Sequence, residues 1–193
     1  MAQRKTKILF FSEAVTLAHI TRPLALAQHL SSDQYEIYFA VREIPKVLQG
    51  ISLPNVINMQ KSIEPKEFEN CLKDGRLPFT PSVLTQQVTE DLQVLNRIKP
   101  DLVVGDFRLS LAISSKLHQV PYINISNLCW SPFAQQKTIV PDVSLRKTLG
   151  LPLTPAFFSL MKKRIYSKMA APFNQVAKSF GLAKIADSIL EVY

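Results

Sequence analysis

The stretch that decides the fold runs from Lys7 to Val41 and reads KILFF, a loop, TRPLALAQHL, a short polar turn and YEIYFAV. Lys7–Phe11 is a short run without polar alternation, which is typical of a parallel strand buried on both faces. Thr21–Leu30 predicts a helix, with Thr21 as its N-cap and Pro23 in its first turn. Tyr35–Val41 predicts a second strand. A strand, a helix and a strand in this order predict a βαβ unit and therefore a parallel sheet.

Working outward from this unit, the same alternation continues along the chain. The predicted elements are a weak strand at 56–59, a short helix and a mobile loop within 60–80, a helix at 81–99, a strand at 102–105, a helix at 109–117 and a strand at 122–125. The fold class predicted from this order is α/β, a doubly wound, Rossmann-like parallel sheet.

The chain of 193 residues is expected to form one domain. Its sheet core is predicted at about residues 5–127, followed by an irregular and helical segment at about 128–193. Helical segments are expected at about 156–170, 172–180 and 184–192.

Glycine is scarce, with five residues that are far apart in the chain. This excludes the dinucleotide-binding fingerprint and the P-loop, because both need clustered glycines. The two cysteines, Cys71 and Cys129, form no CxxC pair and have no adjacent histidine. Because a metal site needs three or four ligands at short spacing, neither a metal nor a bound cofactor is predicted.

The net charge of +8 is concentrated between Lys137 and Lys184, where nine basic residues accompany a single acidic one. Such a basic face suits an anionic membrane, a phosphate-bearing substrate or an acidic partner domain. No nucleic-acid-binding motif is present, so nucleic acid is not expected as a partner. Within this segment, 157–169 carries an apolar stripe beside a basic face. It fits either an interfacial membrane helix or an ordinary helix with a solvated basic side.

A cytoplasmic protein, with peripheral membrane contact left open, is the expected localisation. The apolar run near the N-terminus spans only four residues, Ile8 to Phe11, which is too short for a signal peptide. No stretch of the sequence approaches the roughly 18 apolar residues of a membrane span.

Two polar residues follow neighbouring strands of the predicted sheet. His19 lies in the loop after the first strand, and Asp106 follows the strand at 102–105. Ligands of open parallel sheets bind at the carboxyl ends of the strands where the strand order reverses, so these side chains are expected to meet there. A histidine held by a carboxylate is a general-base arrangement. The alternative is that His19 only caps a helix and Asp106 only completes a turn.

The sequence resembles a known family at several places. Ala18-His-Ile-Thr-Arg-Pro-Leu-Ala-Leu-Ala-Gln-His-Leu30 is similar to the Gly-His-x-x-Pro-Leu-x-x-Leu-Ala-x-x-Leu signature that follows the first strand of GT-B glycosyltransferases. Lys99-Pro-Asp-Leu-Val-Val-Gly-Asp-Phe107 and Val120-Pro-Tyr-Ile-Asn-Ile125 resemble later strands of the same amino-terminal domain. The resemblance points to nucleotide-sugar-dependent enzymes related to the glucuronosyl and macrolide glycosyltransferases.

The resemblance implies that His19 is the catalytic base of an inverting sugar transfer and that Asp106 is its partner. It also implies that this domain holds the acceptor, a sugar, lipid or other small molecule. A nucleotide-sugar would be the co-substrate. The residues expected to line the acceptor pocket are Phe79, Phe107, Arg108, Asn127 and Trp130.

The donor-binding domain of this family has no counterpart in the 193 residues. The partner expected from the resemblance is therefore a donor-binding domain or subunit. Three interpretations remain open: part of a glycosyltransferase, one subunit of a two-chain transferase, and a binding module that has lost catalysis.

Overall fold

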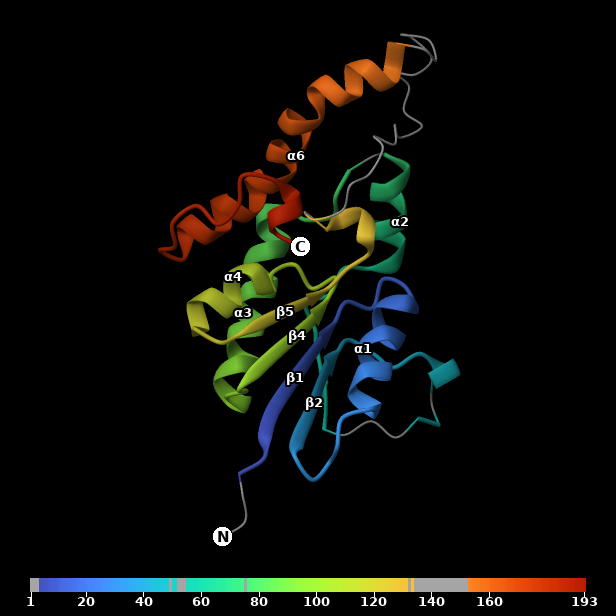
Figure 1. Cartoon of the computed structure of the whole chain (residues 1–193), viewed down its shortest axis with the longest axis vertical. Coiled ribbons are helices and arrows are strands. Elements are labelled where there is room, and N and C mark those ends of the chain that lie inside the picture. Colours follow the sequence, from blue (N-terminus) through green and yellow to red (C-terminus); the bar gives the residue numbers. More distant parts are fainter. Residues whose placement is uncertain (1–3, 49, 52–54, 75, 132, 134–152) are drawn as a thin grey trace.

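A five-stranded parallel sheet forms the centre of the protein, with the strand order β3-β2-β1-β4-β5. The structure is a computed structural model that describes residues 4–48, 50–51, 55–74, 76–131, 133 and 153–193. Figure 1 shows the strands side by side with helices around them. The strands are β1 (Thr6–Ser12), β2 (Tyr35–Val41), β3 (Val56–Asn58), β4 (Leu102–Asp106) and β5 (Tyr122–Ile125). The predicted doubly wound α/β class is confirmed.

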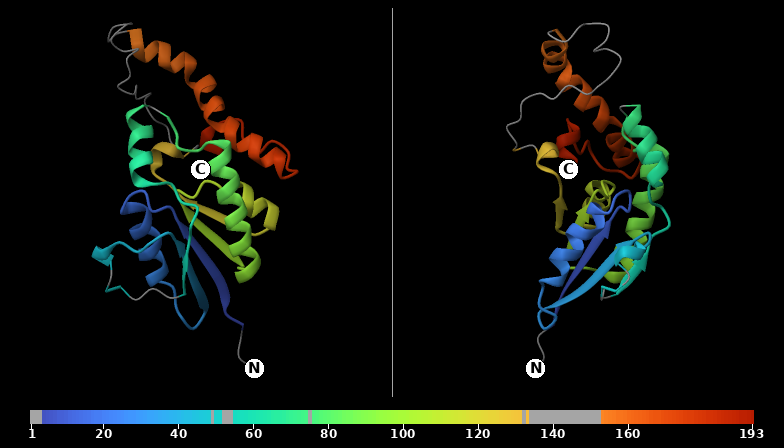
Figure 2. Two further views of the ribbon diagram at one scale, coloured as in Figure 1. Left: turned by 180° about the vertical axis from the view of Figure 1, so that it is seen from behind. Right: turned by 90° about the vertical axis from the view of Figure 1, so that its right-hand side faces the viewer.

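Strand β1 is buried on both faces, and its alternate residues belong to two separate cores. Phe10 packs with Leu24 of helix α1 (Ala18–Gln28) on one face. Phe11 packs with Leu95 of helix α3 (Pro81–Ile98) on the other. Figure 2 shows α1 and α3 on opposite sides of the sheet. This double burial explains why the strand has no polar alternation.

A third core lies beyond the carboxyl ends of the strands. Phe173 and Val176 of helix α6 (Leu153–Ser179) pack there against Leu84 of α3 and Ile113 of helix α4 (Leu111–His118). The amino-terminal part of α6 extends away from the sheet (Figures 1 and 2). The carboxyl-terminal residues return to this end of the sheet through a 3-10 helix, η3 (Ile189–Glu191).

Three local predictions were wrong. Helix α1 begins at Ala18, after the N-cap residue Leu17, so Thr21 lies inside the helix and does not cap it. Helix α6 continues through Pro172 as one helix, where the sequence predicted a break. Residues 184–192 contain only the short η3 and no α-helix. The helix expected within 60–80 is present as α2 (Pro65–Lys73).

Gly105 in β4 lies close to the side chains of Leu111 in α4 and Tyr122 in β5. A Cβ atom at this position would be 2.6 Å from Leu111 and about 3.0 Å from the Tyr122 ring. A side chain at this position would therefore force the Leu111 side chain or the Tyr122 ring to move.

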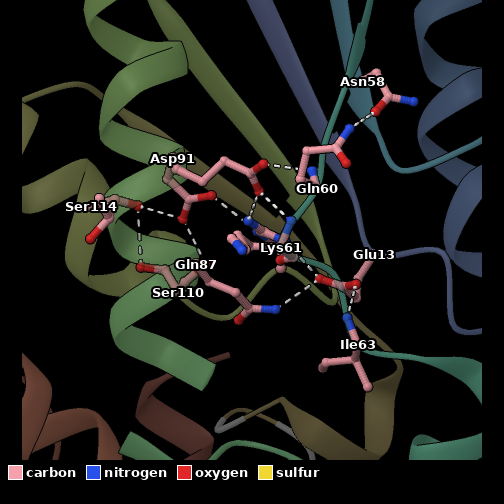
Figure 3. A network of polar contacts seen from close by, with 12 residues as sticks. Glu13, Asn58, Gln60, Lys61, Ile63, Gln87, Asp91, Ser110 and Ser114 are labelled. Carbon is pink, nitrogen blue, oxygen red and sulfur yellow. Dashed lines mark hydrogen bonds and ion pairs between the residues drawn. The ribbon is translucent and has the colours of Figure 1, made fainter. Parts of the chain in front are cut away.

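A buried ionic network joins the loop after β1 to α3 and to the segment before α4. The Arg108 guanidinium, 1% exposed, contacts Glu13 and Asp91 at 3.0 Å and Glu90 at 3.1 Å. Figure 3 shows the Asp91 carboxylate facing Ser110 and Ser114, whose hydroxyls donate to it. Three carboxylates thus share one buried guanidinium, and two of them, Glu13 and Asp91, are themselves fully buried.

This network gives a prediction about the pH dependence of stability. Burial raises the pKa of the Glu13 and Asp91 carboxyls above their ordinary values of 4.5 and 3.8, and Arg108 offsets this only in part. At these two carboxyls the folded state therefore binds more protons than the unfolded chain above about pH 4. Their contribution to the free energy of unfolding should fall as pH rises through the raised pKa values, by at most about 1.4 kcal/mol per pH unit per carboxyl.

Urea denaturation at several pH values between about 4.5 and 8 measures this slope. Glu13→Gln replaces the titrating carboxyl with an amide of similar size that still forms hydrogen bonds, so its slope should be flatter than that of the unaltered chain. Equal slopes in the two proteins would contradict the prediction.

Candidate functional site

The carboxyl ends of β1 and β4 meet at the point where the strand order reverses. Ser12, the last residue of β1, pairs with Asp106, the last residue of β4. The chain leaves β1, turns through residues 13–17 and enters α1, whose first turn carries His19. Because the sheet is parallel, this loop and the end of β4 lie at the same edge. The juxtaposition of His19 and Asp106 expected from the sequence is present.

His19 and Asp106 are in direct contact. Nδ1 of His19 is 2.7 Å from Oδ1 of Asp106. The Asp106 side chain is fully buried, and 12% of the His19 side chain is exposed. Since a carboxylate oxygen only accepts hydrogen bonds, this contact assigns the proton to Nδ1 and leaves Nε2 as the free acceptor.

Arg22 belongs to the same site, although sequence reasoning did not identify it. Its Nε and Nη2 donate to the two carboxylate oxygens of Asp106 at 2.9 and 2.7 Å, and its Nη1 donates to Oδ1 of Asn127 at 2.6 Å. The sequence signal that could have identified Arg22 is its position three residues after His19. Because α1 begins at Ala18, the two side chains lie on the same face of this helix.

Phe107 lies against His19 because the chain turns sharply after β4. The φ angle of Phe107 is 59°, in the left-handed region that residues with a bulky side chain rarely adopt. Its ring stacks on the His19 imidazole, with centroids 4.7 Å apart and an interplanar angle of 18°. The turn therefore limits the rotation of the imidazole.

A cavity of about 120 Å³ opens beside the His19–Asp106 pair. Of the predicted acceptor residues, Phe107, Asn127 and Trp130 line it. The Trp130 ring stacks on Tyr193, with centroids 5.0 Å apart. Burial raises the pKa of the Tyr193 phenol, which stays neutral at physiological pH. The other lining residues are His19, Arg22, Phe68, Leu72, Leu77, Asp106, Ile125, Ser126 and Tyr193.

Phe79 and Arg108 do not line this cavity, contrary to the expectation from the resemblance. The left-handed turn at Phe107 directs the next side chain, Arg108, into the buried ionic network. Phe79 is 3% exposed and lies between Phe107 and Phe173, with ring centroids 5.5 and 5.4 Å apart. Phe79 therefore packs behind the residues that line the cavity, and Arg108 neutralises buried carboxylates.

No metal-binding cluster of three or more histidine, cysteine or acidic residues occurs in the described part of the chain. Among the described residues, no helix combines the length and apolar character needed to cross a membrane. On α6, Lys163, Arg164 and Lys168 are exposed, and Met169 of the apolar stripe packs against the third core. Membrane contact by this helix stays a prediction.

Comparison with known proteins identifies relatives over the whole chain. A "PGL/p-HBAD biosynthesis rhamnosyltransferase" of Mycobacterium bovis (strain BCG / Pasteur 1173P2) is 37% identical over 193 residues, which is 100% of this chain and 42% of that protein. The chain is homologous to glycosyltransferases. An "Inactive PGL/p-HBAD biosynthesis glycosyltransferase" of the same strain is 32% identical over 191 residues, 98% of this glycosyltransferase homologue and 52% of that protein.

This glycosyltransferase homologue thus spans about half the length of the curated relatives it matches. No protein-family profile matches it. Among solved structures, a glycosyltransferase of Streptomyces sp. SF2575 shares 16% identity and a TM-score of 0.44, with 95% of this chain and 48% of that chain covered. The resemblance to glycosyltransferases inferred from the sequence motifs is confirmed.

Proposed function

We propose that this chain is the acceptor-binding half of an inverting, nucleotide-sugar-dependent glycosyltransferase, with His19 as general base and Asp106 as its partner. The observation that carries the proposal is the 2.7 Å contact between His19 Nδ1 and Asp106 Oδ1 at the mouth of an aromatic-lined cavity. The homology to glycosyltransferases supports the reaction class. The other half of the site belongs to a donor-binding domain, in the same or a second polypeptide.

In the proposed reaction, Nε2 of His19 removes the proton from an acceptor hydroxyl. The acceptor oxygen attacks the anomeric carbon of the donor sugar from the face opposite the leaving group. The bond between that carbon and the diphosphate oxygen breaks, and a nucleoside diphosphate leaves with the bonding electron pair. Asp106 offsets the positive charge that develops on the imidazole. A single displacement inverts the configuration at the anomeric carbon.

The cavity constrains how the acceptor binds. About 120 Å³ is well below the roughly 300–1,000 Å³ of pockets that enclose a drug-sized ligand. The space that the described residues leave beside His19 suits the reacting end of an acceptor, and the aromatic residues Phe107 and Trp130 help to line it. We therefore infer an acceptor whose hydroxyl-bearing end is a ring and whose remainder lies outside the cavity.

The test is an assay of the complete transferase, meaning this chain together with its donor-binding domain. Nucleotide-activated rhamnose is the first donor to use, because the 37% identical relative is named a rhamnosyltransferase. With p-nitrophenol or p-nitrophenyl rhamnoside as acceptor, we expect release of nucleoside diphosphate and a product of inverted anomeric configuration. A product of retained configuration would contradict the proposal.

A second candidate is a non-catalytic binding module. The relative named inactive, at 32% identity, is the observation that favours it. This candidate predicts that calorimetry detects binding of p-nitrophenyl rhamnoside to the chain, while the complete protein releases no nucleoside diphosphate with nucleotide-activated rhamnose or with other nucleotide-activated hexoses. Turnover in the assay above would exclude it.

A further inference from the structure

We propose that Arg22 is a positioning residue that fixes the tautomer of His19 and the amide orientation of Asn127. The inference rests on the proposed function, since it concerns how that site is held ready. The Arg22 side chain joins three segments: helix α1, the end of β4 at Asp106, and the residues after β5 at Asn127. Its side chain is 29% exposed, and among the described residues its guanidinium contacts the side chains of His19, Asp106 and Asn127.

The first step concerns the Asp106 carboxylate, which is fully buried. Arg22 binds this carboxylate in a bidentate manner: Nε donates to Oδ2 and Nη2 donates to Oδ1. This geometry fixes the plane of the carboxylate as well as its charge. Oδ1 is thereby directed at Nδ1 of His19. Without Arg22, the imidazole would be the one side-chain partner of the carboxylate among the described residues, and the carboxylate could rotate about its terminal bond.

The second step concerns the proton on His19. Arg22 Nη2 lies 3.0 Å from His19 Nδ1, and Asp106 Oδ1 lies 2.7 Å from the same nitrogen. A guanidinium nitrogen can only donate and a carboxylate can only accept, so Nδ1 satisfies one of them but not both. The shorter contact to a fully buried carboxylate favours a proton on Nδ1. Because Arg22 also holds Oδ1 in this place, it maintains the tautomer in which Nε2 is the base.

The third step concerns Asn127, which lines the cavity. Its Oδ1 accepts a hydrogen bond from Arg22 Nη1 at 2.6 Å. This hydrogen bond turns the amide oxygen toward Arg22, so the Nδ2 group is a donor that remains for a ligand. The Tyr193 hydroxyl also lines this cavity and has no hydrogen-bond partner among the described residues. Beside it, His19 Nε2 offers an acceptor and Asn127 Nδ2 a donor. This pair suits a substrate that presents one hydroxyl to the base and a second oxygen to the amide.

The test combines a spectroscopic and a kinetic measurement. In the chain labelled with ¹⁵N-histidine, we expect the His19 resonances of the form protonated at Nδ1. Only three histidines are present, and His19→Gln identifies the signal. Arg22→Met should shift the His19 signals toward a mixture of tautomers. Arg22→Lys, which holds one carboxylate oxygen, should give an intermediate spectrum. Arg4→Met is the matched control, because Arg4 forms an exposed ion pair with Asp101.

In the complete transferase, Arg22→Met should lower kcat by on the order of tenfold to hundredfold, within the loss expected for a displaced general base. Arg22→Lys should recover part of this loss, and Arg4→Met should leave kcat unchanged. The inference is overturned if Arg22→Met leaves the His19 spectrum and kcat as they are while His19→Ala abolishes turnover. If His19→Ala also leaves turnover unchanged, the proposed function fails instead. If Arg22→Met does not fold, the spectrum and kcat of Arg22→Lys decide, because a fully retained spectrum and rate would overturn the inference.

Discussion

Replacing His19 with alanine is expected to lower kcat of the complete transferase by about 10²–10⁴-fold, the usual contribution of a general base. The loss should fall on kcat more than on KM, because Nε2 takes the acceptor proton only as the new bond forms. Asp106→Asn should lower kcat as well, since the amide can present a donor to Nδ1 and so favour the wrong tautomer. The rate of nucleoside diphosphate release with saturating acceptor measures kcat of both variants, His19→Ala and Asp106→Asn.

His29→Ala is the matched control for this experiment. His29 is the C-cap residue of α1, is exposed, and its Nδ1 is hydrogen-bonded to the carbonyl oxygen of Ala25. Its replacement should leave kcat within about twofold of the unaltered protein, because the imidazole reaches no group of the site. An unchanged kcat in His19→Ala would remove the general-base assignment.

Arg108→Met is expected to cause the largest loss of stability. It removes the guanidinium shared by Glu13, Glu90 and Asp91 and leaves their carboxylates without a cation. Breaking a buried ion pair in this way costs about 3–5 kcal/mol. A domain of this size has a total stability of only about 5–15 kcal/mol. We therefore expect a large fall in the urea midpoint, or a chain that is partly unfolded at 25 °C.

A combined variant separates charge from packing. Arg108→Met together with Glu13→Gln and Asp91→Asn removes the charges that Arg108 neutralised, so it should recover part of the lost stability. Arg4→Met, which breaks an ion pair whose arginine side chain is 73% exposed, should change stability by less than about 1 kcal/mol. A combined variant no more stable than Arg108→Met would show that lost packing, not unpaired charge, dominates.

The strands could be predicted because a strand that is buried on both faces gives a short, mainly apolar run of sequence. Lys7–Phe11 and Tyr35–Val41 are apolar enough to identify strands on their own, and the structure confirms both. Helix ends were harder, because Leu17 caps α1 without a side-chain hydrogen bond. Pro172 reads as a helix breaker, yet packing of the adjacent Phe173 in the third core keeps α6 continuous.

The sequence could place the site residues at the carboxyl ends of the strands, which is the correct edge of the sheet. It could not show in which direction each side chain points. His19 and Asp106 were found because parallel strands bring their ends together. Arg108 was assigned to the pocket because it follows Asp106 by two positions. The positive φ of Phe107 instead turns the chain so that Arg108 enters the buried ionic network. No local sequence pattern predicts such an angle for a phenylalanine. Arg22 was missed because its role depends on where α1 begins.

The contact between His19 and Asp106 also has a consequence for how the protein folds. The two residues are 87 positions apart, and the strands that carry them, β1 and β4, are neighbours in the centre of the sheet. The intervening chain must close a long loop before this strand pair can form, which is a slow step in folding. The site therefore exists only after the central strands have paired. NMR signals from the His19–Phe107 stack should appear late in refolding, together with the native sheet.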